Sequence, residues 1–126
     1  MGDTGHALAF REAVESGDID AVIDLLHPDV VFRSPAVFRP YEGRDMTAFV
    51  LRAVFEVFED FRYIDRLEGD GTHALVFEAR VGDRHLQGWD YLVFDDAGLV
   101  TELTVMVRPL SALQALVAEM GARLGM

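Results

Sequence analysis

The chain of 126 residues contains no cysteine and no lysine. The absence of cysteine excludes disulfide bonds, thiolate metal ligands and a cysteine nucleophile. The absence of lysine excludes a Schiff base with a carbonyl substrate, because that chemistry needs a lysine amine. The reactive groups that remain are carboxylates, hydroxyls, imidazoles and guanidinium groups.

Positive charge is also scarce, since 22 acidic residues face 11 basic ones and the formal net charge is −11. Nucleic acids and anionic membrane surfaces are bound by basic faces, so we expect neither as a partner. No apolar run is long enough to span a bilayer, and Met1–His6 lacks the basic and apolar segments of a signal peptide. We therefore expect a cytoplasmic protein.

Metal ligands are not arranged in any familiar spacing. No pair of His, or of His and Glu, has metal-ligand spacing on one predicted helical face, so we expect no metal and no other cofactor. His85 follows a predicted turn and is expected at the surface or at an interface. Aromatic residues are abundant, with nine Phe, three Tyr and one Trp, and they predict an aromatic interior that is either solid core or the lining of a cavity.

The hydrophobic period changes along the chain from helical to alternating. Gly17 and Asp18 are expected to end the first helix and cap the second, which Pro28 would stop. Turns containing Gly separate the later strands. The sequence predicts helices over 5–16, 18–26, 44–60 and 109–124, and strands over 30–32, 62–68, 73–81, 84–94 and 99–108.

Three helices, a short strand and four strands in hairpin order indicate a single α+β domain over residues 1–126. We expect a cone-shaped, curved antiparallel β-sheet wrapped around the three N-terminal helices, plus a C-terminal helix. Strands 84–94 and 99–107 carry large apolar residues on both faces, which favours a homodimer through the outer sheet face. The alternative is that the last helix covers that face.

Asp90 is a carboxylate inside the apolar strand 89–94. A charge at such a position must be hydrogen-bonded, paired, or shifted toward its neutral form, because burial penalises the ionised group. Asp90 is therefore the candidate catalytic residue, as a proton donor or a base. The alternative is a structural aspartate that pairs with an arginine or lies near a water-filled mouth.

Four segments carry a recognisable pattern: 17–20 (GDID), 25–32 (LLHPDVVF), 41–44 (YEGR) and 89–98 (WDYLVFDDAG). Over its whole length the chain resembles the nuclear transport factor 2-like superfamily, which includes SnoaL-like polyketide cyclases and ketosteroid isomerase. The resemblance implies that Asp90 points into the cone, on the same face as Leu92 and Phe94. His85 and Trp89 would lie on the opposite face, unless a bulge near Gly88 resets the alternation. The fold alone implies no single function, because it hosts enzymes, binding modules and assembly domains.

Ketosteroid isomerases use a Tyr on the first helix and a protonated Asp on a strand to stabilise an oxyanion, while a second Asp moves the proton. Ungapped alignment on 17–18 places Phe10 at the Tyr position and Ser34 at the general-base position, and Asp90 matches the oxyanion-hole Asp. Phe10 has no proton to donate, and the Ser34 hydroxyl is not a base near neutral pH. The resemblance therefore implies a retained pocket with altered chemistry, and not a standard ketosteroid isomerase.

Two other relatives bear on the reaction. SnoaL-like cyclases resemble this chain in keeping an acidic residue on the equivalent strand, as acid or base toward a carbonyl substrate. Limonene epoxide hydrolase uses an Asp-Arg-Asp arrangement to activate water, and Arg80, Asp83 and Asp90 do not match that arrangement convincingly.

The cone interior is expected to be apolar. If the cone is open, its lining becomes a ligand pocket with Asp90 as the polar group. Ser34 and Tyr41 would add hydroxyls near the mouth, unless they serve turn chemistry around Pro35 and aromatic packing. The expected ligand-binding residues are Phe10, Val14, Phe32, Ser34, Phe38, Tyr41, Phe49, Phe58, Leu103 and Val105.

Two functional hypotheses follow. The first is a small acid/base enzyme of isomerase, cyclase or hydrolase type, acting on an apolar or polycyclic carbonyl compound through Asp90. The second is a non-catalytic ligand-binding or dimerisation module with the same pocket. In both, the partner is a small apolar ligand.

Overall fold

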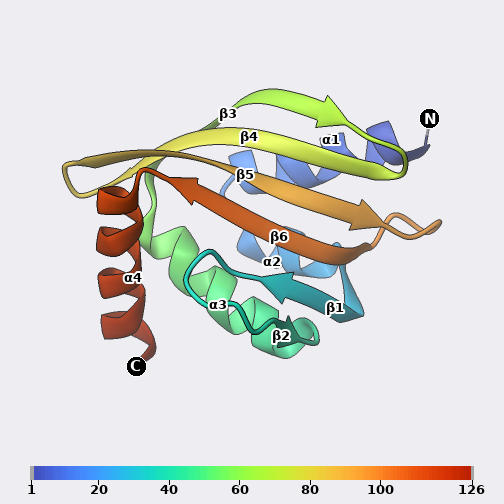
Figure 1. Cartoon of the computed structure of the whole chain (residues 1–126). Helices are drawn as coiled ribbons and strands as arrows, with labels where there is room; N and C mark the ends of the chain where they lie inside the picture. The colour runs from blue at the N-terminus through green and yellow to red at the C-terminus, as the bar shows by residue number, and fades with distance from the viewer. Residues whose placement is uncertain (1, 126) are drawn as a thin grey trace.

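The computed structural model describes residues 2–125 and shows a mixed α+β fold (Figure 1). Its four helices are α1 (Gly2–Glu15), α2 (Ile19–Asp24), α3 (Arg44–Val57) and α4 (Leu110–Leu124). Its six strands are β1 (Leu26–Arg33), β2 (Tyr41–Glu42), β3 (Glu59–Glu68), β4 (Thr72–Val81), β5 (Arg84–Phe94) and β6 (Val100–Arg108).

All six strands form one curved, unclosed sheet in the order β2-β1-β6-β5-β4-β3, with α1, α2 and α3 against its concave face (Figure 1). The predicted α+β class, the three helices inside the curve and the meander β3–β6 are confirmed. The expectation of a fully antiparallel sheet is wrong at one pair, because β1 runs parallel to β6. Helix α3 leads from β2 at one edge of the sheet to β3 at the other edge. The meander then returns across the sheet until β6 lies beside β1.

The boundary between α2 and β1 also differs from the prediction. The helix ends at Asp24 and β1 already begins at Leu26, so Pro28 lies within a strand and does not terminate a helix. Proline lacks the N–H that a ladder needs, and the β1–β6 pairing indeed shifts register between Leu26 and Val31. Asp18 caps α2 as expected, since its carboxylate accepts a hydrogen bond from the Ala21 N–H at 3.1 Å.

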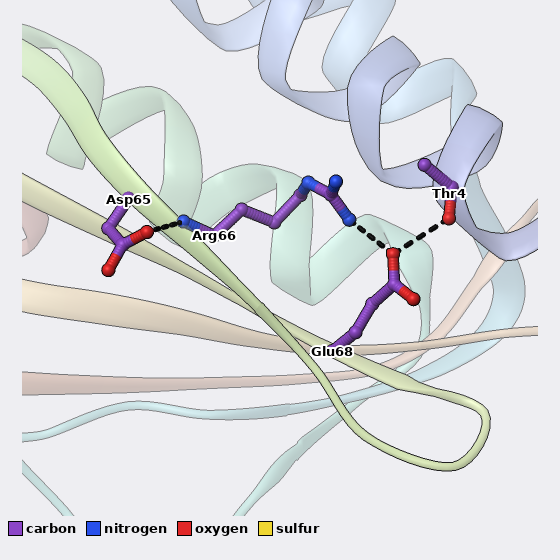
Figure 2. Close-up of polar contacts among 4 residues, drawn as sticks. All are labelled: Thr4, Asp65, Arg66 and Glu68. Atoms are coloured by element: carbon purple, nitrogen blue, oxygen red, sulfur yellow. Dashed lines mark hydrogen bonds and ion pairs between the residues drawn. The ribbon is translucent and has the colours of Figure 1, made fainter.

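Helix α1 is tied to the edge strand β3 at its N-terminal end (Figure 2). The Thr4 hydroxyl donates to Glu68 Oε1 at 2.7 Å, and the same carboxylate forms an ion pair with Arg66. The Asp65 carboxylate accepts a hydrogen bond from the backbone N–H of Arg66 at 2.7 Å. These contacts hold α1 across the concave face, where Ala7 and Phe10 are buried.

Helix α4 lies at one end of the sheet, on the side that carries the other helices (Figure 1). It buries Ala112 and Leu116, and Arg123 pairs with Glu56 of α3 at 3.5 Å. The alternative in which the last helix covers the outer sheet face therefore does not describe this structure. No helix of the described chain is long and apolar enough to cross a membrane.

Candidate functional site

The concave face of the sheet encloses a cavity of about 640 Å³. The inner residues of β1, β3, β5 and β6 form one wall, while α1, α3 and α4 supply the others. The lining is mostly aliphatic and aromatic, and it includes Phe55, Phe58 and Phe61. A cavity of this size and composition suits an apolar molecule of drug-like size.

Asp90 lines this cavity. It pairs with Leu75 of β4 and Val105 of β6, and the alternation of β5 directs its side chain to the concave face, where Leu92 is fully buried. The pairing of β5 with β4 is unbroken through Gly88, so no bulge resets the alternation there. The expected inward direction of Asp90 is therefore what the structure shows, and His85 and Trp89 belong to the opposite face.

The Asp90 carboxylate is held by a tyrosine that the sequence analysis did not select. The Tyr63 hydroxyl donates to Asp90 Oδ2 at 2.5 Å. Tyr63 comes from β3 and is only 5% exposed, and it pairs with Phe77 of β4, two residues from the Leu75 that pairs with Asp90. The tyrosine side chain thus reaches across β4 to the carboxylate on β5.

Burial shifts the titration of both groups. Desolvation raises the pKa of Asp90 from 3.8 to about 6, and the hydrogen bond from Tyr63 opposes that rise because it stabilises the ionised form. The pKa of Tyr63 is raised well above its usual value, first by burial and then by the neighbouring Asp90 carboxylate. Near neutral pH the pair is therefore a carboxylate and a neutral phenol. A carboxyl group with a pKa near 6 is suited to moving protons under physiological conditions.

Eight of the ten residues expected to bind ligand do line the cavity with Asp90. They are Phe10, Val14, Phe32, Ser34, Tyr41, Phe58, Leu103 and Val105. Their role toward a ligand stays a prediction.

Phe38 and Phe49 are corrections to that set. Phe38 is 99% exposed on the loop between β1 and β2, and Phe49 is 55% exposed on α3. The buried residues of α3 are Thr47, Val50, Leu51, Ala53 and Val57, and Phe49 falls outside the stripe that they form.

The two hydroxyl residues near the mouth have structural partners. Ser34 Oγ accepts hydrogen bonds from the N–H groups of Ala36 at 3.2 Å and Val37 at 3.4 Å, which is turn chemistry around Pro35. The Tyr41 ring stacks on Phe32 with 5.9 Å between centroids. Both residues still line the cavity, and the Ser34 hydroxyl retains its own proton for donation.

Glu15 is a second cavity residue that the sequence analysis missed. It is the last residue of α1, and it pairs with Arg11 one turn earlier at 3.2 Å. The period-2 pattern of Phe61 and Tyr63 offered a signal for the tyrosine, since both face the cavity from one strand. Glu15 gave no comparable signal, because a carboxylate near a helix end usually faces solvent.

The remaining polar candidates lie elsewhere. Arg80 pairs with Asp60 at 2.6 Å and Glu59 at 2.7 Å, Asp83 is exposed, and neither Arg80 nor Asp83 lines the cavity. His85 is exposed, as expected. Within residues 2–125, no group of three or more His, Asp or Glu side chains is arranged to hold a metal ion.

Replacement of Asp90 by Asn should change how stability depends on pH. The folded-state pKa of Asp90 is raised, so the native state binds a proton more tightly than the unfolded state between pH 4 and 6, and wild-type stability falls as pH rises through this window. Asp90→Asn lacks this loss and should gain up to about 3 kcal/mol relative to wild type between pH 4 and pH 7.5. Urea unfolding at both pH values measures the change. Asp70→Asn, in the exposed turn after β3, is the control, and an Asp90→Asn difference that stays constant with pH would contradict the burial of the charge.

Replacement of Tyr63 by Phe should raise the pKa of Asp90 above about 6, because the hydroxyl is the group that favours the ionised carboxylate. Carboxyl-carbon NMR titration measures the pKa, with Asp90→Asn to assign the signal. Tyr41→Phe removes a different hydroxyl from the same cavity and is the matched control. An unchanged pKa in Tyr63→Phe would show that the hydroxyl does not bond to the carboxylate in solution.

Known proteins resemble this chain in sequence and in structure. The crystal structure of a steroid delta-isomerase from Pseudomonas aeruginosa is 43% identical, with 98% of this chain and 92% of that chain covered and a TM-score of 0.92. A protein with a cystatin-like fold from Silicibacter pomeroyi is 33% identical, with coverages of 94% and 84% and a TM-score of 0.88. A putative ketosteroid isomerase from Kribbella flavida, at 19% identity and a TM-score of 0.68 over 86% of this chain and 78% of that chain, shares the fold.

No curated protein matches the chain. The family model described as a SnoaL-like domain matches residues 7–103, which is most of the sequence and includes all of the elements from α2 to β5. The matched region contains Tyr63 and Asp90 together with most of the cavity lining. The chain belongs to the SnoaL-like domain family.

Proposed function

We propose that this protein is a small acid/base enzyme that moves a proton on an apolar or polycyclic carbonyl compound, with Asp90 as the group that carries the proton. The observation behind the proposal is a buried carboxyl group with a pKa of about 6 in an apolar cavity of ligand size. The relative from Pseudomonas aeruginosa, described as a steroid delta-isomerase, supports an isomerase among the possible reaction types.

The proposed step needs one carboxylate. Asp90 removes a proton from a carbon beside the carbonyl group, and the electron pair of that C–H bond moves into the carbonyl to give an enolate. When a C=C bond lies β,γ to the carbonyl group, this enolate is a dienolate: the protonated Asp90 gives the proton to the γ-carbon, the double bond moves to the α,β position, and the electron pair on oxygen re-forms the carbonyl group. The product is an isomer, so no oxidant, reductant or cofactor takes part. Exclusion of water by the apolar lining strengthens the base and protects the enolate.

Tyr63 serves this step as a positioning residue. Its hydroxyl holds Oδ2 of Asp90, which leaves Oδ1 as the oxygen for the substrate proton. The aromatic contacts of the Tyr63 ring with Phe61, at 5.0 Å between centroids, and with Phe77, at 6.3 Å, fix its direction. The hydroxyls of Ser34 and Tyr41 are the proposed donors to the enolate oxygen, because both belong to the same cavity lining.

A non-catalytic ligand-binding module is the second candidate. The observation in its favour is the hydrogen bonding of Ser34, which occupies the expected general-base position but accepts two backbone N–H groups of its own turn. In this case the cavity would bind the same class of apolar compound, and Asp90 would contribute one hydrogen bond.

Replacement of Asp90 by Asn separates the two candidates. With a β,γ-unsaturated polycyclic ketone as substrate, we expect kcat to fall by about 10²-fold or more, because the amide cannot accept the proton. The wild-type kcat/KM should rise with pH through about 6, as Asp90 ionises. Absorbance of the conjugated product measures the rate, and Asp70→Asn is the control. Unchanged turnover in Asp90→Asn would remove Asp90 from the mechanism. No wild-type turnover, together with ligand binding that survives Asp90→Asn to within about 1 kcal/mol, would favour the binding module.

We also propose that two copies of the chain associate through the outer sheet face. Trp89 of β5 pairs with Met106 of β6 and Val76 of β4, and this row lies on the face opposite to Asp90. Met106 is half exposed and the adjacent Tyr91 is also exposed. An apolar patch across three strands is typical of an isologous contact between two sheets.

Introduction of charge into this patch tests the proposed homodimer. Met106→Glu and Tyr91→Glu should convert a dimer into a monomer, because a carboxylate would be buried in the contact without a partner. Sedimentation velocity measures the mass. Phe49→Glu adds the same charge at an exposed apolar residue of α3 and should leave the dimer intact. A monomeric wild-type protein would contradict the proposal.

A further inference from the structure

We propose that the cavity selects its ligand by charge: it accepts compounds whose polar end is neutral or cationic and rejects anionic ones, and Glu15 is the second residue that sets this selectivity. This inference rests on the cavity of the proposed function, and it narrows the substrate class of that function. Carbonyl compounds that carry a carboxylate, sulfate or phosphate group would be excluded.

The charged residues of the cavity lining are all of one sign. Asp90 and Glu15 line the cavity, and among the lining residues that the structure describes none is Arg, Lys or His. A ligand anion would therefore enter an apolar space that offers it two carboxylates and no cation. Like charges brought together without water repel strongly, and this repulsion is a recognised source of specificity.

Two arginines near the site, Arg33 and Arg44, are engaged elsewhere. Arg33 is the last residue of β1, next to the loop between β1 and β2, and it donates a hydrogen bond to Glu102 of β6 at 2.9 Å. Arg44 uses its guanidinium to bond the carbonyl oxygen of Leu26 at 2.9 Å. Neither side chain lines the cavity, so neither is placed to receive a ligand anion.

Arg11 is the arginine that acts on Glu15, and its effect is limited. The two side chains are 36% and 38% exposed, and solvent screens an ion pair at that exposure. The Glu15 charge still reaches the inner site, because it adds to the effects of burial and Asp90 that raise the pKa of Tyr63, and the opposing effect of Arg11 is smaller. Glu15 therefore keeps an anion-repelling effect at the α1 side of the cavity.

The selectivity has a source that differs from the overall charge of −11. The field of the whole surface acts over long distances and is screened by salt within about 10 Å at 0.1 M ionic strength. The field of Asp90 acts inside an apolar cavity and is screened much less. A salt series and a matched surface variant therefore separate the two effects.

Displacement of the neutral dye Nile red by three androstanes tests the proposal. The three carry a hydroxyl, an amino or a sulfate group at carbon 3 and are otherwise identical. At pH 8, where Asp90 is ionised, the sulfate should bind at least about tenfold more weakly than the alcohol, and the amine at least as tightly. The gap between sulfate and alcohol should persist in 0.5 M salt.

Three variants and one control variant identify the residues responsible. Asp90→Asn and Glu15→Gln should each reduce the gap by about threefold or more, since each removes one carboxylate from the lining. Glu12→Gln is the matched control, because Glu12 is exposed on α1 and does not line the cavity. Arg11→Gln should widen the gap, since it removes the partner of Glu15.

The possible outcomes distinguish the charge selectivity from the enzymatic function. Equal binding of sulfate and alcohol to the wild type would overturn the charge selectivity, and so would an equal effect of Glu12→Gln and Glu15→Gln. The predicted order of binding without turnover of any ketone would leave the selectivity intact and overturn the enzymatic function alone. Failure of all three androstanes to displace the dye would overturn both the selectivity and the proposed ligand class.

Discussion

The hydrogen bond between Tyr63 and Asp90 is the interaction on which the interior of this protein depends. A carboxylate buried among aromatic and aliphatic side chains loses its hydration, and its partner here is a hydroxyl on a strand two places away in the sheet. A hydrogen bond to a charged group offsets only part of that loss, with a net value of about 1.5–3 kcal/mol. The pKa of the carboxyl group therefore stays raised, whereas a full ion pair with an arginine would have lowered it.

The geometry of that bond constrains the strands around it. Tyr63 on β3 and Asp90 on β5 are separated by β4, on which Tyr63 pairs with Phe77 and Asp90 pairs with Leu75. Gly88 contributes directly, since a Cβ at this position would lie 2.7 Å from Phe77 Cζ and 2.3 Å from the Met106 carbonyl oxygen. The absence of a side chain there leaves room for Phe77, which stacks on Phe61 and meets the Tyr63 ring edge-on. The aromatic cluster thus supports the polar pair without filling the cavity.

The concave face of the sheet contains both solid core and an open cavity. Toward the end where β1 and β6 begin, Leu26, Leu92 and Val100 are fully buried and form solid core. Toward the other end, the space between the sheet and α3 stays open and is bordered by α4 through Leu116 and Met120. An unfilled apolar cavity lowers the stability of a fold, because the side chains that line it lack packing partners on one side. Such cavities are typical of ligand sites in proteins. The open part of the concave face is therefore a region where the fold gives up packing energy.

The sequence by itself determined the fold class, the meander of β3–β6, the inward direction of Asp90 and most of the cavity lining, because each of these follows from the side-chain period of one element or from a recognisable segment. Only the tertiary structure decided that Tyr63 is the partner of Asp90, that Glu15 shares their cavity, and that β1 runs parallel to β6. The tertiary structure also places Phe38 and Phe49 outside the site, because both are exposed. The physical reason is the same in each case. A periodic pattern tells which face of its own helix or strand a residue occupies, whereas strand order, sheet curvature and helix rotation tell which faces meet.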